Sequence, residues 1–127
     1  MAQAPAPVGE RREEDAAFEH LVLDFLAYLE LERGLSRNTL QSYRTDLLQF
    51  GAFLRERAVD APHAESRDVS DFLTALAGAE GSAAATATIQ RKAACLRSFY
   101  RHLRREGICT DDPAGLIAFL QAVPAKS

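Results

Sequence analysis

Residues 25–47 read FLAYLELERGLSRNTLQSYRTDL and contain the end of one helix and the beginning of the next. Apolar residues recur at three- and four-residue spacing from Phe18 onward, as in one buried helix face. Gly34 interrupts this pattern, and glycine is common just after a helix end. Ser36 has a side chain preferred at helix N-caps, and a new apolar stripe follows it. The stretch therefore predicts two consecutive helices, the first beginning at Asp15.

The rest of the sequence predicts three further helices, each bounded by a proline, glycine or serine signal. Their expected ranges are 67–77, 83–106 and 113–121. Ser66 is the expected cap of the first of these, and a turn over 78–82 is expected to end it. No alternating β-branched run is long enough for a strand. The predicted fold class is all-α, a compact orthogonal bundle of four to five helices.

Length and composition indicate a small globular domain with short flanking segments. The chain has 127 residues, of which 47% are hydrophobic and 26% charged. Residues 1–14 combine Ala, Pro and charge without apolar periodicity, so a disordered arm is expected there. The helical domain is expected over 15–121, and 122–127 resemble the beginning of a linker.

Several classes of protein are disfavoured at once. No apolar run approaches the roughly 18 residues of a membrane span, and the N-terminus lacks the pattern of a secretory signal. Two cysteines, Cys95 and Cys109, do not suggest a disulfide framework and favour a reducing compartment. We expect a cytoplasmic protein. The net charge of -3, taken alone, argues against a nucleic-acid binder.

The net charge averages over strongly segregated segments. Residues 1–33 carry a net charge of -5 and residues 58–81 carry -4, whereas residues 34–57 carry +2 and residues 82–106 carry +5. The second and fourth helices therefore hold nearly all of the positive charge. Such a distribution is the electrostatic footprint of a protein that binds a polyanion.

Helical wheels place polar and basic side chains opposite the apolar stripes of these two helices. The outward face of the fourth helix contains Gln90, Arg91, Ala94, Arg97, Ser98, Arg101, Arg104 and Arg105. The outward face of the second contains Asn38, Gln41, Ser42, Thr45 and Gln49, bordered by Arg37 and Arg44. Two other interpretations stay open. The face can be plain solvated surface, or it can pack on acidic helices of this chain or on an acidic protein partner.

Longer motifs resemble a known family. Leu35 to Leu47 follow the pattern L-S-x-N-T-L-x-x-Y-x-x-D-L, which resembles the opening of tyrosine recombinases of the XerC/XerD and phage-integrase type. Residues 88–92 (TIQRK) and 96–103 (LRSFYRHL) are similar to the fourth helix of that family. Residues 112–114 (DPA) stand where the family has an N-P-A-like helix start, with Asp112 in place of asparagine. The resemblance covers residues 16–121 in order and spacing.

The resemblance implies the N-terminal core-binding domain of a site-specific recombinase, which would contact a duplex DNA half-site with its second and fourth helices. With the helical wheels, it gives as DNA-contacting residues Ser36, Arg37, Asn38, Thr39, Gln41, Ser42, Arg44, Thr45, Gln90, Arg91, Arg97, Ser98 and Arg101. It also implies other recombinase protomers as partners in a synaptic tetramer of the full-length protein. The isolated domain is expected to be monomeric.

The family's catalytic groups, a tyrosine nucleophile with arginines, a lysine and histidines, belong to a domain beyond the linker. Tyr43 and Tyr100 lie on apolar stripes, where a core role is expected, and Cys95 is expected to pack beside the core. The three histidines show no metal-ligand or acid–base spacing. We expect no catalytic residues, metal or cofactor in this chain. The alternative function is a helical protein–protein interaction module.

Overall fold

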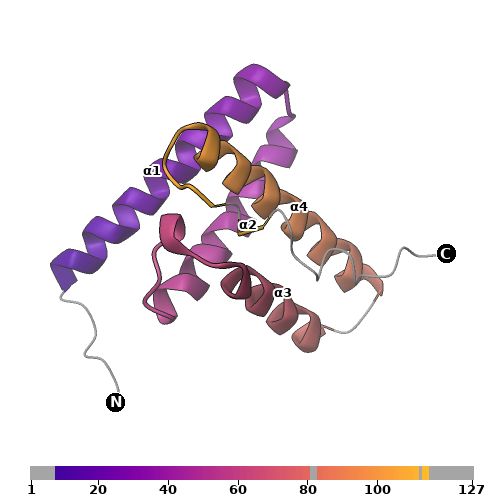
Figure 1. Ribbon diagram of the computed structural model, residues 1–127. Coiled ribbons are helices and arrows are strands. Elements are labelled where there is room, and N and C mark those ends of the chain that lie inside the picture. Colours follow the sequence, from indigo (N-terminus) through magenta and orange to yellow (C-terminus); the bar gives the residue numbers. More distant parts are fainter. Residues whose placement is uncertain (1–7, 81–82, 112, 115–127) are drawn as a thin grey trace, which may run out of the picture.

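The computed structural model describes residues 8–80, 83–111 and 113–114 (Figure 1). Within them the chain forms four α-helices and one short 3-10 helix. Their bounds are α1 Val8–Arg33, α2 Arg37–Glu56, η1 Ala61–His63, α3 Ser66–Glu80 and α4 Ala83–Arg105. The predicted all-α class is confirmed, and the described ranges contain no strand. The expected fifth helix, 113–121, lies outside the described residues except for Pro113 and Ala114, which form a turn.

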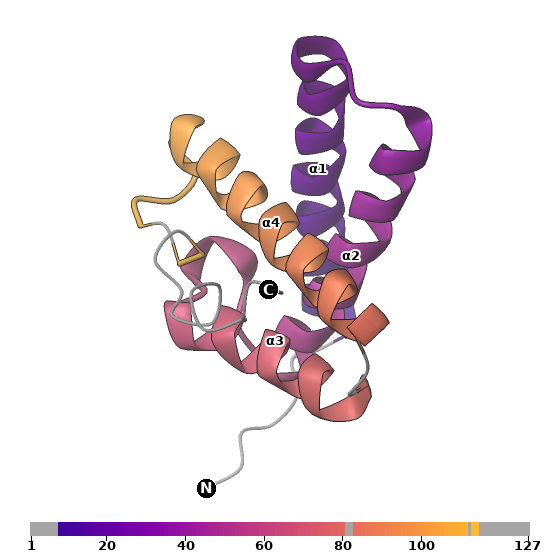
Figure 2. The ribbon, with the colours of Figure 1, turned by 90° about the vertical axis from the view of Figure 1, so that its right-hand side faces the viewer.

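Helices α1 and α2 form a hairpin that α4 crosses. Figure 2 shows α1 and α2 joined at one end by the short connection through Gly34, with α4 running diagonally over them. Helix α3 packs against α4 and the later part of α2. One core therefore lies between the hairpin, α3 and α4. Within the described ranges, no helix is both long and apolar enough to cross a membrane.

The core contains the predicted apolar face of α4. Its buried members are Ile89, Ala93, Leu96, Phe99, Tyr100 and Leu103. Edge-to-face ring contacts join these residues to the other helices, with ring centroids 5.4 Å apart for Phe25 and Phe99 and 6.2 Å apart for Phe50 and Tyr100. The Tyr100 hydroxyl donates a 2.8 Å hydrogen bond to the carbonyl of Ala61, so the buried phenol is satisfied.

The cap signals around α2 and α4 behave as predicted. The Ser36 Oγ accepts a hydrogen bond from the Thr39 N–H at 3.2 Å, which makes Ser36 the N-cap of α2. Gly34 and Gly107 have φ of +63° and +76°, the left-handed conformation that glycine adopts without strain. After α4, the Ile108 N–H donates to the Leu103 carbonyl at 2.9 Å, as in a Schellman motif.

The start of α1 corrects one expectation. The helix begins at Val8 rather than Asp15, so residues 8–14 of the expected disordered arm are helical. Glu and Arg, which dominate residues 10–14, are good helix formers, and they extend a helix without adding an apolar stripe. Asp15 is also paired with Arg55 of α2 at 3.5 Å.

Both ends of α3 differ from the prediction. Ser66 is the first helical residue rather than the cap, because the Glu65 carbonyl accepts from Asp68 and Val69. The Asp68 carboxylate in turn accepts from the Glu65 N–H at 2.8 Å, one half of a capping box. The helix also continues through Gly78 to Glu80, so the turn expected over 78–82 is wrong for residues 78–80. One glycine costs a helix only about 1 kcal/mol, which does not end it.

Candidate nucleic-acid interface

The outward face of α4 is basic, as the helical wheel predicts. Its exposed members are Gln90, Arg91, Arg97, Arg101, Arg104 and Arg105, whereas Ala94 and Ser98 are half-buried. We refer to these eight residues as the α4 face. Because α4 crosses the outside of the bundle, this face lies on a surface and not between helices (Figure 2).

Three arginines of the α4 face have no acidic partner among the described residues. Among the residues that the structure describes, Arg97, Arg101 and Arg104 take part in no ion pair. Arg105 donates to the Tyr28 hydroxyl at 2.8 Å and lies 5.4 Å from the centre of its ring, and this bond lowers the pKa of Tyr28. Internal pairing with the acidic helices therefore does not account for most of the charge on α4.

The predicted residues of α2 divide between two sides of the helix. Arg37, Gln41 and Arg44 line a shallow groove against α1, together with Glu30 and Leu26. Exposed side chains that do not line this groove include Ser36, Asn38 and Thr45, while Thr39 and Ser42 are half-buried.

The α4-facing side of α2 is marked by Asp46. Ser42 stands one turn before Asp46, on the side turned toward α4. Arg37 and Arg44 instead belong to the α1 side, so the structure does not gather all the predicted residues of α2 on one face.

Ser36 and Thr39 are engaged in the cap of α2. The Ser36 hydroxyl donates to Thr39 Oγ1 at 3.1 Å while accepting from the Thr39 backbone. Their first role is thus to satisfy the helix end, and the hydroxyl proton of Ser36 is used within the cap. Asn38 and Thr45 keep polar atoms at the surface.

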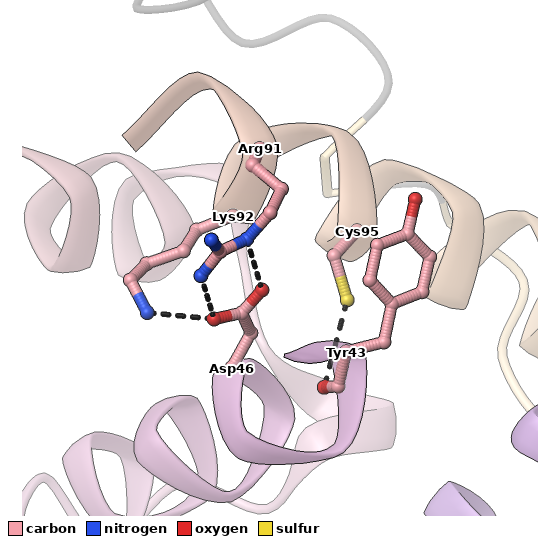
Figure 3. A network of polar contacts seen from close by, with 5 residues as sticks. All are labelled: Tyr43, Asp46, Arg91, Lys92 and Cys95. Carbon is pink, nitrogen blue, oxygen red and sulfur yellow. Dashed lines mark hydrogen bonds and ion pairs between the residues drawn. The ribbon is translucent and has the colours of Figure 1, made fainter. Parts of the chain in front are cut away.

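A buried carboxylate joins α2 to α4 (Figure 3). Asp46 is 1% exposed and accepts hydrogen bonds from two cations of α4. Arg91 donates from Nε to Oδ2 at 3.1 Å and from Nη2 to Oδ1 at 2.8 Å, and Lys92 donates from Nζ to Oδ1 at 2.7 Å. These bonds raise the pKa of Arg91. We call Asp46, Arg91 and Lys92 the Asp46 cluster.

The helical wheel finds Arg91 but not its partners. Arg91 is exposed as predicted, with 44% of its side chain accessible, yet the carboxylate holds it in place. Lys92, 11% accessible, lies on the buried side of α4. The sequence does contain a signal for such an ion pair. Asp46 follows Tyr43 by three residues and so lies on the inward side of α2, where a buried acid needs a cation.

The reactive side chains of this region have core roles. Cys95 is buried beside the Asp46 cluster with its Sγ 3.9 Å from the Tyr43 carbonyl, and burial raises the pKa of its thiol (Figure 3). Burial also raises the pKa values of Tyr43 and Tyr100. The described residues contain no group of three His, Cys, Asp or Glu side chains placed to hold a metal.

His102 is buried at the contact between α4 and α1. Its ring centroid lies 5.0 Å from that of Tyr28 and 5.6 Å from that of Phe25. Its Nδ1 has no hydrogen-bond partner in the part of the chain that the structure describes, and burial lowers the pKa of the imidazole. The side chain packs between helices and does not reach the α4 face.

The described residues form a bundle of four α-helices in which α4, the helix that crosses the others, has a basic outer face. The family model "Phage integrase, N-terminal SAM-like domain" matches residues 22–107, and the chain belongs to this family. It is 41% identical over 93 residues to the tyrosine recombinase XerD of Rhizobium meliloti and 43% identical over 89 residues to the tyrosine recombinase XerC of Herpetosiphon aurantiacus. These alignments cover 73% and 70% of this chain, but only 29% and 28% of the relatives. No solved structure matches.

Proposed function

We propose that this chain binds duplex DNA and forms the N-terminal half of the clamp of a site-specific tyrosine recombinase. The observation that carries the proposal is the α4 face, where Arg97, Arg101 and Arg104 are exposed and unpaired within the described residues. Unpaired arginines on one helix repel one another and are stabilised by phosphates. Its relatives are named tyrosine recombinases, which supports the same function.

The chemistry of the two helices suits the backbone and the grooves of DNA. Arg97 and Arg101 would neutralise phosphates, which fixes position without reading sequence. Amides and hydroxyls such as Asn38, Thr45 and Gln90 can donate to phosphates or to base edges. The chain would thus give affinity first and a limited sequence preference second.

The relatives also suggest the wider setting. This chain spans less than a third of each relative, and in a recombinase of the relatives' length strand cleavage through a 3′-phosphotyrosyl intermediate would fall to another domain. The process that it serves would be the resolution of chromosome dimers or the integration of mobile DNA. The other protomers of a synaptic tetramer would be its protein partners.

A salt titration tests the proposal. Fluorescence anisotropy of a labelled duplex, titrated with the 127-residue chain at several salt concentrations, gives log K against log salt. If three to five arginines each neutralise one phosphate, the slope will lie between about -2.7 and -4.5. An absence of binding at low salt would contradict the proposal and favour the protein–protein interaction module.

A pair of double variants locates the surface. Arg97→Ala with Arg101→Ala should lower the magnitude of the slope by about 2 and weaken binding on all sequences alike. The matched control is Arg55→Ala with Arg67→Ala, which removes the same charge from arginines paired with Asp15 and Glu65 away from α4. Far-UV circular dichroism checks that both variants fold. Equal weakening by the two pairs would show that only net charge matters.

A further inference from the structure

The charges of the Asp46 cluster do not balance. One carboxylate accepts from two cations, so the cluster has a net charge of +1. Lys92 is nearly buried and its Nζ is 2.7 Å from Oδ1, so its charge is sufficient to balance that of the carboxylate. Arg91 is the accessible member of the three, with 44% of its side chain exposed. The excess positive charge therefore appears at the surface through Arg91.

The carboxylate also fixes the direction of Arg91. Its two bonds use Nε and one N–H of Nη2, which holds the guanidinium plane in a side-on fork (Figure 3). The two N–H groups of Nη1 and the second one of Nη2 have no partner among the described residues. An unrestrained arginine loses side-chain entropy when it binds a ligand, whereas a restrained one has lost it on folding.

We propose that Asp46 is a positioning residue that holds Arg91 as a preorganised phosphate donor, while Lys92 neutralises Asp46 and keeps the charge of Arg91 available. This inference rests on the proposed DNA binding and distinguishes two kinds of arginine contact within it. Arg97 and Arg101 are unpaired charges that adapt to the duplex, whereas Arg91 is a fixed contact that sets how α4 lies on it.

A charge-neutral double variant tests the inference. Asp46→Asn with Lys92→Met removes one negative and one positive charge, and methionine keeps the packing of the lysine stem. Electrostatics alone predicts unchanged DNA affinity, because the net charge of the chain is the same. Positioning predicts affinity about tenfold weaker at equal salt, since the fork that orders Arg91 is lost. Parent-like affinity in this variant would overturn the proposal.

A cycle with Arg91 separates positioning from a structural effect. In an Arg91→Ala background, the same pair of substitutions should change affinity by less than about twofold, because the residue through which Asp46 acts is gone. The same loss in both backgrounds would mean that Asp46 acts through the packing of α2 on α4, which overturns the proposal. Far-UV circular dichroism is recorded for all four proteins.

Arg91→Lys keeps the proposal testable if the double variant fails to fold. Lysine retains the charge but cannot form the fork, so affinity about tenfold weaker is expected with the same net charge. An affinity equal to that of the parent would overturn the proposal. The titration of the parent chain tests the proposed function separately. If the parent does not bind DNA, both proposals are contradicted. If the parent binds and the variants have the same affinity, only the positioning role of Asp46 is contradicted.

Discussion

Two clusters of charged side chains connect α2 to neighbouring helices. One contains a single acid between two cations, and the other contains a single cation between two acids. In the Asp46 cluster one buried acid binds Arg91 and Lys92 of α4. At the end of α2, Arg57 is bound instead by two acids of α3, with its Nε 3.4 Å from Asp68 and its Nη1 2.9 Å from Asp71. The Arg57 guanidinium also lies 5.2 Å from the centre of the Phe53 ring.

The difference shows how the fold keeps its charges segregated. The Asp46 cluster leaves a net charge of +1 on the α4 side, whereas the Arg57 cluster leaves -1 at the α3 end. Each cluster joins helices without cancelling the sign of the region around it. A molecule of net charge -3 can therefore present a positive surface to a polyanion.

The largest effect is expected from Asp46→Ala. Removing the acid leaves the ammonium of Lys92 buried without a counter-charge, which costs about 3 kcal/mol in the free energy of unfolding. Urea denaturation followed by far-UV circular dichroism measures it. Adding Lys92→Met should recover most of the loss, and a failure of that second substitution to help would place the damage elsewhere.

An intermediate effect is expected from Asp68→Ala. Asp68 is buried, accepts from the Glu65 N–H and faces Arg57, so its loss removes half a capping box and one ion pair. We expect a decrease of about 1.5 kcal/mol in the free energy of unfolding. Urea denaturation measures this decrease. Asp68→Asn retains an acceptor for the cap, so its free energy of unfolding should decrease less than that of Asp68→Ala. Equal losses would contradict a capping role.

A smaller effect is expected from Asp71→Ala at the exposed edge of the same cluster. The side chain of Asp71 is 54% accessible, and exposed ion pairs contribute little because solvent screens them. The free energy of unfolding should fall by about 0.5 kcal/mol or less. A loss as large as that of Asp46→Ala would mean that the two clusters are energetically alike despite their difference in burial.

The smallest effect on stability is expected from a change of pH that protonates His102, which packs between α4 and α1. Burial lowers its pKa below the ordinary 6.5, so the unfolded chain takes up the proton first. Its contribution to stability is thus complete above that ordinary value and is lost as the pH falls toward the folded-state pKa. Thermal unfolding at a series of pH values should show a flatter decline for His102→Leu than for the parent.

The helices and the basic face could be predicted because they depend on neighbours in the sequence. Ser36 and Gly107 are local signals, and the apolar spacing from Ile89 to Leu103 places the core side of α4. Exposure of Arg97 and Arg101 follows from the same spacing. These features can be predicted without knowing how the helices cross.

The remaining features depend on tertiary contacts or on weak local preferences. Asp46 and Arg91 are 45 positions apart, so their fork exists only because α2 and α4 cross at that point. The early start of α1 rests on the helix propensity of charged residues, which gives no periodic signal. The sequence favours Ser66 as the cap because serine directly precedes the expected helix start, whereas the Asp68 carboxylate caps by reaching back to the Glu65 N–H.

The contact between α2 and α4 also contains a chemical probe of its own motion. The Cys95 thiol is buried there, and its raised pKa keeps it in the unreactive thiol form. A thiol reagent can therefore modify Cys95 only when the two helices separate, with Cys109→Ser removing the second cysteine from the signal. The rate of modification under native conditions measures how often this contact opens, and DNA that holds both helices should slow it.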